Sequence, residues 1–263
     1  MRQRCPAGAK HTKGMVIVEK SLAYLDNAIE LLAQIKQTQA DAIDKAIRMM
    51  FDCYQKGGSL FVFGASHAGI IAEEMFYRAG GLMVVNPIFN PTLMLNTRPT
   101  TITSDMERLE GFGGIILDGS PIKPGDLLII HSVSGRNSVT IDMALKALEK
   151  DISIIVITNM EYTRKVLSRH SSGKLLHELG DIVIDNCGVY GDACIDIGED
   201  GVIAGPTSTF SGAVIANMLC VGFAELCDAN GIDPPVYISA NMDVDKTRIE
   251  KVLRENADRI HYL

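Results

Sequence analysis

The chain has 263 residues, of which 47% are hydrophobic and 22% are charged, and its formal net charge is −7 at pH 7. This length fits one large α/β domain or at most two small ones, and the composition is that of an ordinary soluble globular protein with ample material for a core. The negative net charge and the lack of any large basic block argue against a nucleic-acid or membrane partner.

The cysteines and the N-terminus indicate the compartment. The six cysteines are scattered without a Cys-x-x-Cys pair, and several lie in apolar runs where a reduced thiol acts as a small hydrophobe. A disulfide framework and a zinc knuckle are therefore disfavoured, and a cytoplasmic location is expected. Residues 1–14 are basic and lack the apolar core of a signal peptide. We interpret them as a disordered lead-in, with Met15 as a candidate start, and we find no apolar run of membrane-spanning length.

Helical spacing of apolar residues dominates the first part of the chain. It predicts two helices over residues 16–56 with a break near Gln37–Asp41. A short buried strand follows at Ser59–Phe63. The turn Gly64–Gly69 then leads into a predicted helix over Ile70–Ala79, and a second strand is predicted at Leu82–Pro87.

Further strand and helix patterns alternate through the rest of the chain. Asn90–Pro99 is irregular and Asp105–Leu109 is a short helical piece, while Phe210–Cys227 is apolar all round, as in a core or subunit-interface helix. The remaining predicted elements are a strand, loop and helix over Asp126–Lys150, strands at Ile152–Thr158, Asp181–Asp185 and Val202–Ala204, and an amphipathic helix over Asp245–Arg259.

The alternation of strands and helices predicts the architecture. Strands that are apolar throughout belong to a parallel sheet covered on both faces, so we expect an αβα sandwich. Right-handed crossovers place the loops that start at Gly64 and at Ser132 on one edge of the sheet, where ligands bind at a switch in strand order, and the loop that starts at Thr158 is a further candidate. We expect one domain over 15–263, with N-terminal helices over 16–56, a core over 57–230 and a C-terminal tail and helix over 231–263.

The segment Val133–Ser138 is the most informative part of the chain. It follows the buried strand directly and precedes a helix whose first backbone N–H groups are free to bind an anion. Gly135 permits close backbone approach, and Ser132, Ser134, Asn137 and Ser138 add side-chain donors. The alternative is a simple capped helix start. Arg136 either neutralises a phosphate or faces solvent.

At these residues the chain resembles the sugar isomerase (SIS) domain superfamily. The matching stretches are Phe63-Gly64-Ala65-Ser66-His67, the loop Ser132–Asn137, and Pro206-Thr207-Ser208-Thr209 at the start of the long helix. Ala72–Gly81 and Ser168–Lys174 resemble the bacterial single-domain branch of phosphosugar isomerase-like proteins. The chain departs from that branch at Ala68 and Gly69, where Ser and His are usual, and at His131, where an aliphatic residue is usual.

The resemblance implies a fold, a ligand and an assembly. The fold is a three-layer αβα sandwich around about five parallel strands. The ligand is a phosphorylated sugar, bound by Gly64, Ser66, Ser132, Ser134, Gly135, Arg136, Asn137, Ser138, Thr207, Ser208 and Thr209. The leading function is aldose–ketose isomerisation, without a cofactor. Subunits of such proteins usually pair to complete each site, so a homodimer or higher homo-oligomer is expected.

Two residues are the candidate catalysts. Glu74, or its neighbour Glu73, could move the proton between adjacent carbons, and the alternative is an i,i+4 ion pair of Glu74 with Arg78. His67 at a helix start is expected to stay neutral and to assist ring opening, unless it only caps the turn.

Three further residues are second-tier candidates, and two other functions stay open. His131 reads as a satisfied core histidine, whereas His170 and Lys174 form an i,i+4 pair on the surface or on a lid. No ligand spacing indicates a metal, and the G-x-G-x-x-G pattern of a dinucleotide site is absent. The other functions are a non-catalytic phosphosugar sensor and a phosphosugar lyase or etherase.

Overall fold

The structure, a computed structural model, describes residues 18–263 except 199, 244 and 246. The expected lead-in over 1–14 and the candidate start at Met15 lie outside these residues. Five parallel strands form the central sheet in the order β2-β1-β3-β4-β5. The strands are β1 (Leu60–Gly64), β2 (Val85–Pro87), β3 (Leu127–His131), β4 (Ser153–Thr158) and β5 (Ile182–Asp185).

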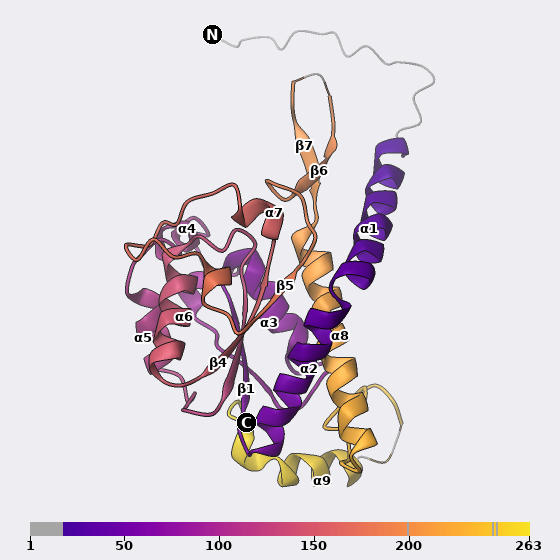
Figure 1. The fold of residues 1–263 in the computed structure, drawn as a ribbon. Coiled ribbons are helices and arrows are strands. Elements are labelled where there is room, and N and C mark those ends of the chain that lie inside the picture. Colours follow the sequence, from indigo (N-terminus) through magenta and orange to yellow (C-terminus); the bar gives the residue numbers. More distant parts are fainter. Residues whose placement is uncertain (1–17, 199, 244, 246) are drawn as a thin grey trace, which may run out of the picture.

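Helices cover both faces of this sheet (Figure 1). Because alternate strand residues point to opposite faces, Leu60 and Val62 pack in one apolar cluster and Phe61 and Phe63 in another. The first cluster joins the sheet to α1 (Glu19–Thr38), α2 (Ala40–Gln55), α3 (Ile70–Met75), α8 (Ser208–Ala229) and α9 (Thr247–Glu255). The second joins it to α5 (Phe112–Asp118) and α6 (Ser138–Glu149). The predicted three-layer α/β sandwich is therefore confirmed.

Several predicted elements differ from the structure. The helix predicted to Ala79 ends at Met75, because Phe76 turns extended and its ring packs edge-on against Tyr262, 4.8 Å away between centroids. The second strand begins at Val85 instead of Leu82, which pairs in an isolated bridge with Val236. The short helix expected at Asp105–Leu109 is α4 (Ile102–Met106).

Two elements were not predicted, α5 and the strand β6 (Ala193–Asp196). β6 pairs antiparallel with β7 (Ile203–Pro206), and this ribbon extends from the body of the molecule beside α1 (Figure 1). The hydroxyl of Tyr24 on α1 donates to the Pro206 carbonyl over 2.7 Å, which fixes the base of the ribbon. A short helix α7 (Met160–Thr163) follows β4.

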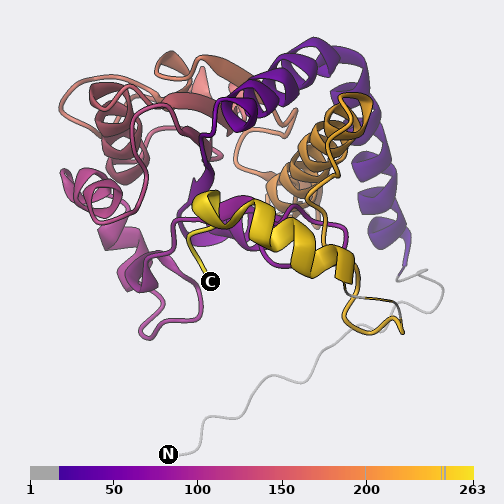
Figure 2. The ribbon, with the colours of Figure 1, turned by 90° about the horizontal axis from the view of Figure 1, so that it is seen from below.

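The long helix α8 is apolar enough, by length and composition, to pass as a membrane span, so the expectation that no segment reaches that length is wrong. It has a mean hydropathy of 1.7 and 44% of that window is buried. Its buried face includes Leu219 and Phe223, which belong to the core. Core helices of soluble proteins pass the same test, so this feature is weak evidence for a membrane. The predicted C-terminal helix is divided into α9 and a 3₁₀ turn, Ala257–Arg259, which lie across one end of the molecule (Figure 2).

Candidate functional site

A pocket of about 270 Å³ opens where the loops after β1 and β3 leave the sheet. These strands are neighbours, and the chain continues from β1 to one side and from β3 to the other, so the pocket lies at the switch in strand order. Gly64 pairs in register with His131, which brings the two strand ends level. Its lining includes Ser66, His67, Ser132, Ser134 and Asn137.

The loop after β3 forms the floor of this pocket. Ser132 and Ser134 line it, and neither hydroxyl has a hydrogen-bond partner among residues 18–263 outside the three undescribed positions. No backbone N–H from Val133 to Ser138 donates to a protein acceptor in the same part of the chain. Gly135 has a φ of 60°, which an L side chain rarely adopts. These are the features of a backbone nest that can bind an anion.

The same loop is held rigidly by its carbonyl groups. Each carbonyl from Ser132 to Arg136 accepts a hydrogen bond from a neighbouring segment, so the peptide groups are fixed before any ligand arrives. In chain order the donors are Thr158 Oγ1 (2.6 Å), Asn159 N (3.1 Å), Thr163 Oγ1 (3.2 Å), Leu176 N (2.9 Å) and Arg169 N (2.9 Å).

Ser138 differs from the other predicted donors of this loop. Its hydroxyl is buried and donates to the Arg169 carbonyl over 3.2 Å, so only its backbone N–H remains for a ligand. Arg136 does not line the pocket, and its Nε is buried without a partner among the described residues. The structure thus brings Ser132, Ser134 and Asn137 to the pocket and directs Ser138 away from it.

The turn after β1 forms the opposite wall. Ser66, His67 and Ala68 line the pocket from a short 3₁₀ helix, Ser66–Gly69. Gly64 permits this tight turn, because a Cβ there would lie 2.4 Å from the Ala68 carbonyl oxygen. His67 is exposed at the mouth of the pocket.

His131 supports that turn from behind. Its ring is 1% exposed, and Nδ1 lies 3.0 Å from the Ala68 carbonyl oxygen, so Nδ1 carries the proton and donates. Burial lowers the pKa of His131 below its ordinary value, partly opposed by this hydrogen bond. Nε2 is buried with no partner in the described part of the chain, so the expected satisfied core histidine is satisfied at one nitrogen only.

Four polar residues that the sequence did not single out also line the pocket: Glu107, Thr140, Tyr162 and Asp192. Glu107 lies just beyond α4 and accepts a hydrogen bond from Asn137 Nδ2 over 2.6 Å. Asn137 Oδ1 in turn accepts from Arg169 Nη1 over 2.7 Å. Glu107 therefore holds a carboxylate at the pocket wall, about 30 residues before the loop that it contacts.

Asp192 occupies the start of α8. Its carboxylate accepts from the backbone N–H and hydroxyl groups of both Thr207 (3.0 Å each) and Ser208 (2.7 Å each). These two predicted ligand donors are therefore directed at an internal carboxylate instead of the pocket, and Thr209 does not line the pocket either. Asp192 adopts a φ of 68°, which orients its side chain into this position.

Glu74 lies outside the pocket. Its carboxylate pairs with Arg78 and accepts from Asn217 Nδ2 of α8 over 2.8 Å. This is the ion pair that the spacing allowed as the alternative to a catalytic role. The described residues contain no group of three or more His, Cys, Asp or Glu side chains that could hold a metal ion.

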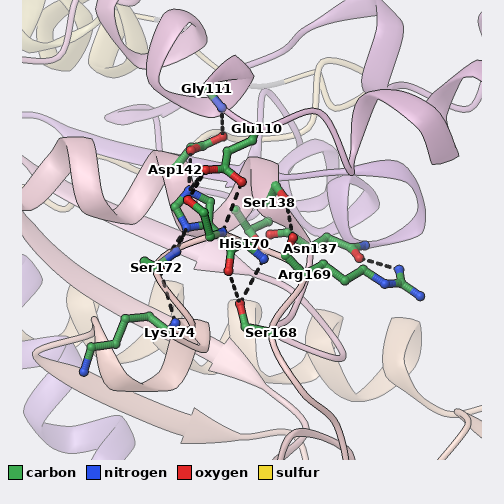
Figure 3. A network of polar contacts seen from close by, with 12 residues as sticks. Glu110, Gly111, Asn137, Ser138, Asp142, Ser168, Arg169, His170, Ser172 and Lys174 are labelled. Atoms are coloured by element: carbon green, nitrogen blue, oxygen red, sulfur yellow. Dashed lines mark hydrogen bonds and ion pairs between the residues drawn. The ribbon is translucent and has the colours of Figure 1, made fainter.

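His170 and Lys174 also lie away from the pocket, in a network of polar contacts (Figure 3). The His170 Nε2 lies 2.9 Å from Asp142 Oδ1 of α6, and its Nδ1 lies 2.8 Å from the Ser172 hydroxyl. Lys174 forms a surface ion pair with Glu178 at 3.2 Å. His170 thus fixes the segment that carries Arg169, whereas Lys174 contributes a solvated pair of small energetic effect.

Comparison with known proteins defines the family. Residues 23–159 match the SIS domain, which is more than half of the chain, and the chain belongs to this family. It is 45% identical over 240 residues to a UPF0309 protein of Shouchella clausii, covering 91% of this chain and 98% of that protein. It is 35% identical over 240 residues to a UPF0309 protein of Streptomyces coelicolor, covering 91% and 96%.

A solved structure shows the same fold at low sequence identity. The phosphoheptose isomerase of Francisella tularensis superposes with a TM-score of 0.55 at 16% identity, over 80% of this chain and all of that one. The SIS resemblance expected from the loops after β1 and β3 is confirmed by the family match and by this fold.

Proposed function

We propose that this chain binds a phosphorylated sugar in the pocket between β1 and β3 and interconverts its aldose and ketose forms. The observation that carries the proposal is the loop Ser132–Ser138. The carbonyls from Ser132 to Arg136 accept hydrogen bonds from neighbouring segments, while the N–H groups from Val133 to Ser138 and the Ser132 and Ser134 hydroxyls have no partner among the described residues. Such a nest suits a phosphate monoester, whose oxygens accept several hydrogen bonds at once.

The opposite wall supports proton transfer. Isomerisation removes a proton from the carbon beside the carbonyl, forms an enediol, and returns a proton to the neighbouring carbon, so the sugar gains and loses no atoms. We assign the transfer of the carbon-bound proton to Glu107, because its carboxylate lines the pocket. Asn137 Nδ2 donates to this carboxylate over 2.6 Å and orients it. His67, exposed at the pocket mouth, would exchange the hydroxyl proton needed for ring opening.

We also propose that two copies of the chain associate. Four large apolar side chains of the first described helical segment are exposed: Val18, Leu22, Leu25 and Ile29. A further apolar hollow of about 560 Å³ lies between α2 and α8 and includes Ile47 and Val221. Contiguous exposed apolar surface of this kind marks an interface. The proposed location remains the cytoplasm, in keeping with the free state of the five described cysteines.

The test is thermal stabilisation by matched phosphorylated and unphosphorylated sugars. A ligand at about a hundredfold above its dissociation constant should stabilise the protein by about 2.7 kcal/mol. Ser134→Ala should lose most of the shift, while Ser21→Ala, which removes an exposed hydroxyl on α1, should keep it. No shift across a broad panel, with a folded sample, would overturn the proposal.

Turnover then separates the possible reactions. Incubation of the stabilising sugar phosphate in D₂O, followed by NMR, should show the isomer and deuterium on the carbon beside the carbonyl. Binding without either change would identify a sensor, and two fragments or an eliminated group would identify a lyase or etherase.

A further inference from the structure

Three arginines lie near one another beside the pocket. Arg108 follows α4, Arg136 belongs to the loop after β3, and Arg169 follows α7. None of them forms an ion pair among the described residues, although the chain as a whole carries a net charge of −7. Burial, followed by the charges of Arg136 and Arg108, lowers the pKa of the Arg169 guanidinium, and the nearby Glu107 carboxylate partly opposes this shift. Like charges therefore lie close together here, and Glu107 offsets part of their repulsion.

The arginine cluster, Arg108, Arg136 and Arg169, adjoins the pocket but does not line it. Arg169 Nη1 donates to Asn137 Oδ1 over 2.7 Å (Figure 3). The Asn137 side chain also donates to the Glu107 carboxylate. Arg136 Nε is buried with no partner in the described part of the chain. The loop already offers N–H and hydroxyl groups for one phosphate, so the cluster is not needed for that phosphate.

The cluster is fixed before any ligand binds. The backbone N–H of Arg169 donates to the Arg136 carbonyl over 2.9 Å, and its carbonyl accepts from the Ser138 hydroxyl over 3.2 Å. The next residue, His170, is fixed by Asp142 at 2.9 Å. The Val139 N–H donates to the Glu107 carbonyl over 3.1 Å, which ties the backbone next to Arg108 to the same loop. These contacts fix the backbone at the arginines, and Asn137 also holds the Arg169 guanidinium, so this part of the chain loses little freedom when an anion binds.

We propose that the arginine cluster binds a second anionic group of the substrate, so that the substrate is a sugar phosphate that also carries a carboxylate or a second phosphate. This inference rests on the proposed function and specifies its substrate class. Guanidinium groups recognise both anions, because their N–H donors form pairs of parallel hydrogen bonds with two oxygens. The second anion would also relieve the repulsion among the three arginines.

The test compares three probes by thermal stabilisation and calorimetry at low ionic strength. These are fructose 6-phosphate, fructose 1,6-bisphosphate and 6-phosphogluconate. At least one of the doubly anionic compounds should bind about tenfold more tightly than fructose 6-phosphate, the gain of one charge-assisted hydrogen-bond pair. Which of the two gains more distinguishes a phosphate from a carboxylate.

Arg108→Gln tests the role of the cluster, because this side chain is exposed and makes no hydrogen bond that folding needs. The variant should lose most of the tenfold gain and bind fructose 6-phosphate as before. Arg254 is an exposed arginine on α9, and Arg254→Gln should change neither the affinity for fructose 6-phosphate nor the gain of the doubly anionic compounds.

Two results would overturn the inference while the proposed function stands. In the first, fructose 6-phosphate binds and the doubly anionic compounds bind no more tightly than it does. In the second, Arg108→Gln weakens fructose 6-phosphate and the doubly anionic compounds equally, which would assign the arginines to the first phosphate. If no phosphorylated compound binds at all, the proposed function itself fails, and the inference with it.

Discussion

Two helices of this protein begin with hydroxyl-rich segments, and the structure uses them differently. At α6, the N–H groups from Val133 to Ser138 and the hydroxyls of Ser132 and Ser134 have no protein partner among the described residues. At α8, the donors of Thr207 and Ser208 all contact the Asp192 carboxylate. The first helix start is open to an external anion, and the second is filled by an internal one.

The difference shows that hydroxyl groups before a helix do not by themselves identify a ligand site. Both starts satisfy the rule that free N–H groups attract an anion. What separates them is whether another segment supplies a carboxylate to the backbone N–H groups. Asp192 reaches α8 from the loop before β6 and accepts from the backbone N–H groups of Thr207 and Ser208, whereas the Glu107 carboxylate accepts only from the Asn137 side chain of the α6 loop. The chemistry is therefore expected on the α6 side.

The largest expected effect concerns the base on the α6 side. Glu107→Gln keeps an oxygen that can accept from Asn137 but cannot take a proton, so substrate binding should persist while kcat falls about 10²- to 10⁴-fold. The rates are measured on the sugar phosphate that stabilises the protein. Glu74→Gln is the matched control, because that carboxylate lies outside the pocket and pairs with Arg78. A large loss in the Glu74 variant alone would assign the proton transfer to Glu74.

The next effect concerns the filled helix start. Asp192→Ala leaves four donors at the start of α8 without their acceptor and should lower the free energy of unfolding by about 2–3 kcal/mol. Asp192→Asn retains an acceptor oxygen and should lose about half as much. Urea unfolding measures both.

Unfolding in the presence of inorganic phosphate tests whether the start of α8 can bind an external anion. If α8 has no role in ligand binding, phosphate should stabilise Asp192→Ala no more than the unaltered protein. Recovery of most of the lost stability in phosphate would show that both helix starts bind anions, and the contrast between them would fail.

The sequence predicted the sheet and one side of the site, and missed the contacts that depend on tertiary packing. The run Leu127–Ile130 is apolar throughout because β3 is covered on both faces, so its pattern is visible locally. The loop after it carries its own donors. Glu107 and Asp192 carry no local signal, since each acts on a segment distant in the chain. The helix α5 likewise gives no clear local signal, because Gly113 and Gly114 in its first turn have a low helix propensity. Packing against α6 makes this segment helical.

The third prediction concerns the rigidity of the α6 loop. Gly135→Ala forces a side chain into a φ of 60°, with its Cβ 3.3 Å from Thr158 Oγ1, and should lower stability by about 1–2 kcal/mol and weaken phosphosugar binding. Gly173→Ala is the matched control, since Gly173 has a φ of 70° but no neighbour within 4 Å. Thermal unfolding with and without ligand measures both. Equal stability losses with unchanged binding would show that the loop does not need this close packing.

The smallest effect concerns His131, which lies between the two helix starts. It contacts Ala68 of the pocket turn, and its Nε2 would lie 3.2 Å from a Cβ on Gly212 of α8. Because burial lowers the pKa of folded His131, the unfolded chain takes up a proton first as the pH falls. This group's contribution to stability is therefore present above the unfolded pKa of about 6.5 and is lost below it, by at most about 1.4 kcal/mol per pH unit.

His131→Asn separates this contribution from those of the other histidines. The asparagine amide can still donate toward the Ala68 carbonyl but cannot titrate. Urea unfolding between pH 7.5 and pH 5 should show the stability of the unaltered protein approaching that of the variant as the pH falls, by up to about 2 kcal/mol. Parallel profiles would mean that His131 accepts a proton in the folded protein as readily as in the unfolded chain. Its unpaired Nε2 would then be reachable by solvent, and the packing that separates the open helix start from the filled one would be looser than the structure shows.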